Sequence, residues 1–227
     1  KTWSTPTGGF MELRRELCRY FSRRFHVEYQ PEQEVLVTVG GSEAIDLCVR
    51  TLINPGDEVL VVQPSFVCYV PMVQMAHGVA KIIETKACNE FRLTAQELEE
   101  HITPKTKLLI LPFPNNPTGA VMRRRHLEEI APVIKKHNLL VLSDEIYSEL
   151  TYGDEPPVSI AEISGMRERT IVVNGFSKTY AMTGWRLGYA LGPAPILSQM
   201  TKLHQYAIMS APTTAQYAAI EALRNGD

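Results

Sequence analysis

Leu108-Leu-Ile-Leu111, the helical stretch Arg123–His137 and Leu139-Leu-Val-Leu142 follow one another in this chain and decide its fold. Each tetrapeptide is a continuous apolar run, which is typical of a strand buried on both faces of a sheet. A helix between two such strands favours a parallel pairing, because parallel strands need a long crossover connection. This stretch therefore predicts a strand–helix–strand unit in a sheet that is covered on both sides.

The same alternation continues outward in both directions. Turn residues 54–57 separate an earlier helix from a strand, and Thr94-Ala-Gln-Glu97 has the spacing of a capping box before a short helix. We predict one α/β domain with three αβα layers and a mainly parallel sheet of about seven strands. Further strands are expected at 35–39, 59–62, 79–83, 171–173 and 187–191. Further helices are expected at 42–53, at 66–75, after the capping box up to about residue 102, and at 196–223 with an interruption around Pro212.

Composition excludes several classes of protein. The chain has 227 residues, of which 44% are hydrophobic and 21% charged, and its net charge of −2 gives no electrostatic reason to bind nucleic acid or an anionic membrane. No apolar run approaches the roughly 18 residues of a membrane span. The four cysteines, Cys18, Cys48, Cys68 and Cys88, form no CxxC pair, so we expect no metal site and a reducing, cytoplasmic location.

Ligands of such sheets bind at the carboxyl ends of the strands, so the residues after each strand are candidates for a site. Gly40-Gly41-Ser42 stands between a predicted strand and a helix, where backbone N–H groups can hold an anion. A plain glycine turn with Ser42 as the helix N-cap is the alternative. In the loop 112–119, three prolines favour an extended backbone that presents Asn115 and Asn116, although Asn-Pro is also a common turn starter.

Two further strands are followed by ionisable residues. Asp144 ends a strand buried on both faces, so its carboxylate needs a partner, either a cationic ring nitrogen or a structural Arg. Tyr147 either reaches the same crevice or is a core aromatic. Lys178 lies between a buried strand and a small-residue turn, where it can serve as a nucleophilic amine, although an isolated Lys is usually a surface residue. Arg186, placed at the start of the next strand, suits a phosphate.

These four positions together supply an anion site, an amide, a carboxylate with a phenol, and an amine with a guanidinium. They describe a receptor for a phosphorylated aromatic ligand that has a basic nitrogen and forms an imine. Pyridoxal 5′-phosphate (PLP) fits each of these requirements.

Three motifs carry a resemblance to a known family. Asn116-Pro-Thr-Gly119, Asp144-Glu-Ile-Tyr147 and Ser177-Lys178-Thr-Tyr-Ala-Met-Thr-Gly-Trp-Arg186-Leu-Gly188 resemble the class I/II aminotransferases of PLP fold type I. The branch with bacterial aspartate and aromatic aminotransferases is the most similar. The resemblance implies a transaminase that moves an amino group between an amino acid and a 2-oxo acid through a Schiff base at Lys178.

The resemblance also implies a role for each matching residue. Lys178 would hold the cofactor and act as general base and acid, while Asp144 would pair with the pyridine nitrogen. Asn116 and Tyr147 would hydrogen-bond the 3′ oxygen of the ring. The phosphate would be held by Gly41, Ser42 and Arg186, and the ring faces would be covered by Phe66 and Ile146. For Phe66 a simple core aromatic is the alternative.

Two positions depart from the family pattern. Gly175 stands where many relatives have a phosphate-binding Ser, so Ser177, or Ser42 with Arg186, would take over that contact. Trp3-Ser4 stands where relatives usually have a Tyr that reaches the phosphate of the neighbouring subunit.

The resemblance further implies how the chain is organised. We expect residues 1–227 to be the PLP-binding large domain, without the small C-terminal domain and the N-terminal arm. Such a segment would be inactive as a transaminase on its own, because the family's substrate-clamping Arg lies in the small domain. A homodimer is expected. Two alternatives stay open: a PLP-dependent C–S lyase on the same scaffold, and the aminotransferase-like effector domain of a transcription regulator.

Overall fold

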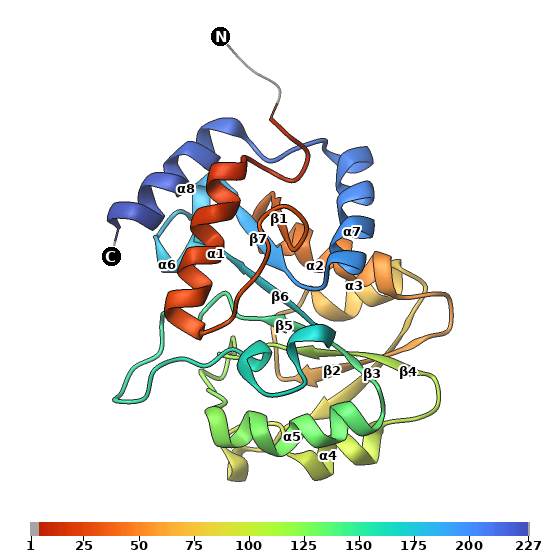
Figure 1. Cartoon of the computed structure of the whole chain (residues 1–227). Coiled ribbons are helices and arrows are strands. Elements are labelled where there is room, and N and C mark those ends of the chain that lie inside the picture. Colours follow the sequence, from red (N-terminus) through yellow and green to blue (C-terminus); the bar gives the residue numbers. More distant parts are fainter. Residues whose placement is uncertain (1–4, 227) are drawn as a thin grey trace.

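The computed structural model describes residues 5–226, which form a seven-stranded sheet with helices on both faces (Figure 1). The strand order is β1-β7-β6-β5-β4-β2-β3, and all pairs are parallel except those that β7 makes with β1 and β6. The predicted α/β class and mainly parallel sheet are confirmed. The strands are β1 (Val35–Thr38), β2 (Glu58–Gln63), β3 (Val79–Glu84), β4 (Thr106–Leu111), β5 (Leu140–Asp144), β6 (Thr170–Gly175) and β7 (Gly188–Leu191).

Alternate residues of the central strands face different helix layers. Val59 and Val61 of β2 belong to the core formed with α2, α3 and α7, whereas Leu60 and Val62 belong to the core formed with α4 and α5. This is the predicted αβα sandwich, and it explains why the strands are apolar throughout. The helices are α1 (Met11–Phe25), α2 (Gly40–Leu52), α3 (Tyr69–Met75), α4 (Ala95–His101), α5 (Arg124–Lys136), α6 (Phe176–Thr179), α7 (Ala194–Ala207) and α8 (Thr213–Asn225).

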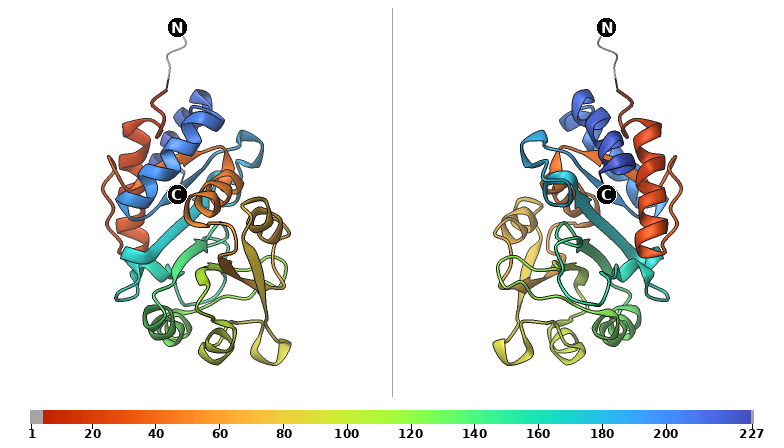
Figure 2. Two further views of the ribbon diagram at one scale, coloured as in Figure 1. Left: turned by 90° about the vertical axis from the view of Figure 1, so that its right-hand side faces the viewer. Right: turned by 90° about the vertical axis from the view of Figure 1, so that its left-hand side faces the viewer.

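Helix α1 was not expected from the sequence. Its buried side chains, including Leu13, Leu17 and Phe21, pack into one core with α8, β1 and β7. Figure 2 shows these first and last helices, in red and dark blue, side by side at one end of the molecule.

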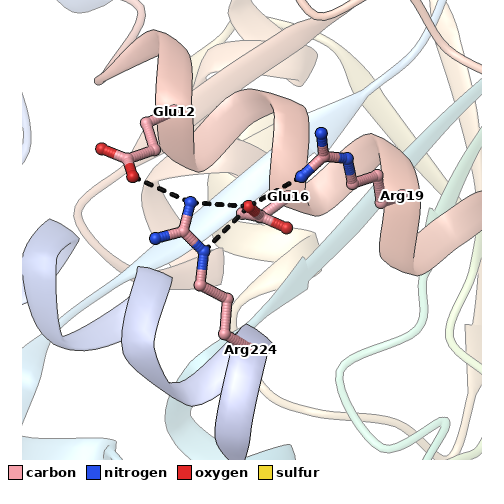
Figure 3. A network of polar contacts seen from close by, with 4 residues as sticks. All are labelled: Glu12, Glu16, Arg19 and Arg224. Atoms are coloured by element: carbon pink, nitrogen blue, oxygen red, sulfur yellow. Dashed lines mark hydrogen bonds and ion pairs between the residues drawn. The ribbon is translucent and has the colours of Figure 1, made fainter.

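An ionic network joins α1 to α8 on the surface (Figure 3). The Nη2 of Arg224 donates to Glu12 Oε1 at 2.8 Å and to Glu16 Oε1 at 2.8 Å, and Arg19 Nη1 donates to the same Glu16 oxygen at 3.0 Å. These contacts tie together two helices that lie about as far apart in sequence as this chain allows.

Several predicted boundaries are corrected by the structure. The helix expected over 42–53 begins at Gly40, and the helix expected over 66–75 begins at Tyr69, so that Phe66 precedes it in a loop. The capping box is confirmed, because Thr94 Oγ1 accepts from Glu97 N and Glu97 Oε2 accepts from Thr94 N. The break near Pro212 is also confirmed, between α7 and α8. Within residues 5–226, none of the helices combines the length and the apolar character that crossing a membrane requires.

Candidate active site

A cavity of about 320 Å³ opens at the carboxyl ends of the parallel strands. It brings together the nine residues to which the resemblance gives a role toward the cofactor, from six different segments of the chain, whereas Asn115 is not part of its lining. The lining residues are Gly41, Ser42, Ile45, Phe66, Tyr69, Pro112, Pro114, Asn116, Asp144, Ile146, Tyr147, Ser177, Lys178, Thr183 and Arg186.

The start of α2 forms one end of the cavity. Gly40 has φ +74°, and a Cβ there would lie 2.7 Å from Arg186 Nη2, so only glycine allows the guanidinium this close to the helix N-terminus. A Cβ on Gly188 would lie 2.4 Å from the carbonyl carbon of Gly40, so β7 can touch the start of α2 only through a glycine. A helix N-terminus beside a guanidinium is suited to an anion such as a phosphate.

Two expectations at this end of the cavity are wrong: Ser42 is not the N-cap of the helix, and Arg186 does not begin the next strand. The N-cap of α2 is Val39, which makes no side-chain hydrogen bond, so Ser42 lies in the first turn rather than capping the helix. Arg186 ends a 3₁₀ turn with φ +53° and precedes β7 instead of beginning it. Its Nη1 donates to the carbonyl of Thr183 at 3.0 Å, which holds the guanidinium over the cavity mouth.

Asp144 also lines the cavity, at the tip of β5 and 7% exposed. Its Oδ2 accepts from the Tyr69 hydroxyl at 2.7 Å and its Oδ1 from the backbone N–H of Ile146 at 3.2 Å. Burial raises the pKa of the Asp144 carboxyl, and these two hydrogen bonds only partly oppose that shift. Among residues 5–226 no Arg, Lys or His forms an ion pair with Asp144, so the structural-Arg alternative is wrong.

Tyr69 is a site residue that the sequence analysis missed. It begins α3, and its ring meets that of Phe66 edge-on with centroids 6.3 Å apart. The sequence did contain one indication of its role, because Tyr69 follows the candidate Phe66 by three residues. The carboxylate that Tyr69 contacts is 75 residues away in sequence.

The loop after β4 divides its two asparagines between different tasks. Asn115 is buried, donates to the Pro112 carbonyl at 3.2 Å and accepts from the Thr118 hydroxyl at 2.8 Å, so it holds the loop together. Asn116 reaches the cavity, where its Nδ2 donates to the Tyr147 hydroxyl at 3.4 Å. Tyr147 lines the cavity and is partly exposed, so the core-aromatic alternative is wrong.

Lys178 lines the same cavity. It lies on α6, the single helical turn that follows β6, and it is partly buried rather than a solvated surface residue. Its Nζ is 5.6 Å from the centre of the Tyr147 ring. An amine, a phenol and an amide thus face one space.

Phe66 is 44% exposed and lines the cavity, so the core-aromatic alternative is wrong for it as well. At Gly175 a Cβ would lie 3.0 Å from the carbonyl oxygen of Leu187 and 3.2 Å from Ile146 Cδ1, which leaves little room for a serine. Ser177, the suggested replacement, does line the cavity. Trp3 and Ser4 lie outside the described residues.

These features fit pyridoxal phosphate. Within residues 5–226 the buried Asp144 carboxylate has only neutral donors, which suits a protonated ring nitrogen. The helix N-terminus with Arg186 suits a phosphate, and Lys178 supplies an amine in the same cavity. Within residues 5–226 no cluster of three or more His, Cys, Asp and Glu side chains could hold a metal ion.

Comparisons with known proteins agree with this geometry. The family model described as aminotransferase class I and II matches residues 2–227. YugH of Bacillus subtilis is 49% identical over 98% of this chain, and an aspartate aminotransferase of Pyrococcus abyssi is 43% identical over 97%. A crystal structure of an aromatic aminotransferase from Pyrococcus horikoshii superimposes with a TM-score of 0.96, at 42% identity over 99% of this chain.

The chain spans 57% of the length of both sequence relatives and 60% of the solved structure. Pyridoxal phosphate is the cofactor of the family whose model matches almost every residue. The motifs, the fold and the cavity thus agree on one assignment. This chain belongs to the class I and II aminotransferases.

Proposed function

We propose that residues 1–227 form the PLP-binding large domain of a transaminase, which transfers an amino group between an amino acid and a 2-oxo acid. The observation that carries the proposal is the cavity in which Lys178, Asp144 and Arg186 face one space. An amine, a carboxylate that has no cationic partner among the described residues, and a guanidinium at a helix N-terminus match the three functional parts of PLP. The aminotransferase names of the relatives support the transaminase over the C–S lyase and over the regulator domain.

The proposed chemistry divides between the cofactor and the chain. Bound PLP supplies an electron sink for negative charge that develops at the substrate Cα. Lys178 Nζ would hold the cofactor covalently until the amine of the amino acid takes its place, and the freed amine would then move a proton, first as general base and then as general acid. Its place on a short helix after a buried strand holds Nζ within reach of the cavity without fixing it in an ion pair.

Asp144 and its neighbours hold the ring. The Asp144 carboxylate keeps a proton on the ring nitrogen, because a buried anion stabilises an adjacent cation strongly. The Tyr69 hydroxyl and the Ile146 N–H orient the two carboxylate oxygens. Asn116 and Tyr147, which contact each other, would bind the 3′ oxygen, and Phe66 and Ile146, which line the cavity, would pack against the ring.

The phosphate binds at the start of α2. The backbone at Gly41, the hydroxyl of Ser42 and the guanidinium of Arg186 surround this end of the cavity. The helix dipole adds to the attraction for an anion.

Replacement of the proposed catalytic lysine tests the assignment. Lys178→Ala should abolish the visible absorbance band that wild type gains with PLP, together with the mass of PLP that borohydride fixes to the chain. Lys105→Ala, at an exposed turn before β4, is the matched control and should behave as wild type. Covalent PLP that persists in Lys178→Ala would refute the assignment.

The reaction type is tested by product analysis. Incubation of the full-length protein that contains this domain with a panel of amino acids and 2-oxo acids should give a new amino acid and the 2-oxo acid of the donor. Pyruvate with ammonia from a sulfur-containing donor would indicate the C–S lyase instead.

We also propose a cytoplasmic homodimer. The four cysteines are free in the structure, which suits a reducing compartment. Tyr206 and Met209, which lie on either side of the C-terminal end of α7, are 86% and 64% exposed. Association of two chains would remove this apolar surface from water. Sedimentation equilibrium of the protein should give twice the monomer mass.

A further inference from the structure

A buried polar contact lies directly behind the start of α2. Glu43 Oε1 lies 2.7 Å from Nδ1 of His204, which belongs to the last turn of α7. Since the carboxylate accepts, Nδ1 carries the hydrogen. His204 is 0% exposed, and its other ring nitrogen, Nε2, is buried without a hydrogen-bond partner.

The same carboxylate also holds the backbone that leads into the helix. Glu43 Oε2 accepts from the N–H of Val39 at 2.5 Å, so one side chain bonds both α7 and the residue before Gly40. This contact fixes the turn at Val39–Gly40, where the chain has φ +74° and passes under Arg186. The N-cap of α2 makes no side-chain hydrogen bond to the first turn, and Gly41 and Ser42 of that turn line the cavity, so their N–H groups are available to an anion.

The burial of His204 needs an explanation of its own. A fully buried imidazole with one unsatisfied nitrogen is costly, and an apolar residue would pack at this position without that cost. The bond to Glu43 is the contact that offsets it, and Glu43 stands in the first turn of the helix that forms the anion end of the cavity.

We propose that His204 is a positioning residue for the phosphate cradle, acting through Glu43. It holds the Glu43 carboxylate against the Val39 N–H and away from the anion that binds at Gly41 and Ser42. Without His204, the carboxylate can rotate, which loosens the turn and brings a negative charge near the phosphate. The inference rests on the proposed function only in naming PLP as the phosphate that binds.

Paired ligands and paired variants test this role. The affinity of the chain for PLP and for pyridoxal, which lacks the phosphate, is measured by visible absorbance in wild type, His204→Leu and His204→Asn. The Asn side chain can donate from about the position of Nδ1, whereas Leu cannot. Met200→Ala removes a buried side chain from the same face of α7 and controls for loosened packing.

We expect His204→Leu to bind PLP about tenfold more weakly, the usual effect of losing a hydrogen bond to a charged group, with unchanged affinity for pyridoxal. His204→Asn should recover most of the loss, and Met200→Ala should keep the wild-type ratio of the two affinities. A His204→Leu chain that melts earlier yet keeps the wild-type ratio would overturn the proposal and assign His204 to packing alone.

A second measurement does not depend on cofactor chemistry. Inorganic phosphate should shift the NMR signals of the Gly41 and Ser42 amides in wild type, and His204→Leu should need about tenfold more phosphate for the same shift. Equal titrations in both chains, or no shift in wild type, would overturn the positioning role. Failure of PLP to attach to wild type would instead count against the proposed function, and the phosphate titration would still decide the role of His204.

Discussion

On the α1–α8 surface, Glu12 and Glu16 share the guanidinium of Arg224 (Figure 3), whereas in the cavity Asp144 has a phenol and a backbone N–H as its partners. Both carboxylates of the network are neutralised by the chain itself, although Glu16 is 8% exposed and so nearly as buried as Asp144, which is 7% exposed. Asp144 is buried, so an unneutralised charge there is costly. The difference indicates that compensation at Asp144 is left to a ligand, and that the folded chain is less stable until one binds.

The largest expected effect comes from removing the buried charge. Asp144→Asn should weaken PLP binding by about 3 kcal/mol, roughly a hundredfold in Kd, because the ring nitrogen loses its anionic partner. The same change should raise the stability of the ligand-free chain by about 1 kcal/mol, since a buried charge is removed. Urea unfolding without cofactor and absorbance titration with PLP measure the two effects. If Asp144→Asn lowered both the affinity for PLP and the unfolding free energy of the ligand-free chain, the idea that Asp144 is left for a ligand to neutralise would be wrong.

The features of the fold and of the cavity that could be predicted are those that depend on residues close together in the sequence. Continuous apolar runs identified the strands, and their carboxyl ends identified Asp144 and Lys178, because chain direction and ligand position are coupled in parallel sheets. The antiparallel direction of β7 was not predicted, since an apolar run has the same composition in either direction. Tyr69 was missed because its partner is distant in sequence, and tertiary contacts of that kind have no local pattern.

Helix α1 is a different case. Leu13, Leu17, Phe21 and Phe25 are buried at spacings of four residues, so a helical pattern was present. The many charged residues between them conceal it, and part of that charge serves the network with α8.

Glu145 extends the comparison to a second buried carboxylate. Burial raises the pKa of its carboxyl from 4.5 to about 7, against hydrogen bonds from Ser159 and Ser143, and its Oε2 has no hydrogen-bond partner. Between these pKa values the folded chain keeps a proton that the unfolded chain loses. Stability should therefore fall as the pH rises from 4.5 to 7 and change no further above 7.

Glu145→Gln should remove this dependence, because the amide does not titrate. At about 1.4 kcal/mol per pH unit, wild type should lose about 2 kcal/mol between pH 5.5 and pH 8 relative to the variant. Urea unfolding of both chains at the two pH values gives the difference. Parallel pH profiles would show that Glu145 is ionised in the folded chain across this range.

A smaller effect is expected from the phenol that Asp144 does have. Tyr69→Phe removes the donor to Oδ2 and leaves the ring in place, so PLP binding should weaken by about 1.5 kcal/mol, the value typical of a hydrogen bond to a charged group. Because the carboxylate loses a stabilising hydrogen bond, the pKa of Asp144 should rise further. The absorbance of bound PLP, titrated with acid, should then change at higher pH in the variant than in wild type. Identical acid titrations would mean that Tyr69 only fills space.

The smallest effect is expected at the surface, where the comparison began. Arg224→Ala deletes the guanidinium that Glu12 and Glu16 share. Water replaces it at Glu12, because the Arg224 and Glu12 side chains are 42% and 54% exposed, and Glu16, whose side chain is 10% exposed, keeps its contact with Arg19. Unfolding free energy should fall by about 0.5–1 kcal/mol, and less at 1 M salt, since screening already weakens the pair. Affinity for PLP should not change, because the network lies outside the cavity lining. A loss of several kcal/mol in urea unfolding, insensitive to salt, would mean that Glu16 depends on this Arg as a buried carboxylate does, and that the surface and the cavity follow one rule.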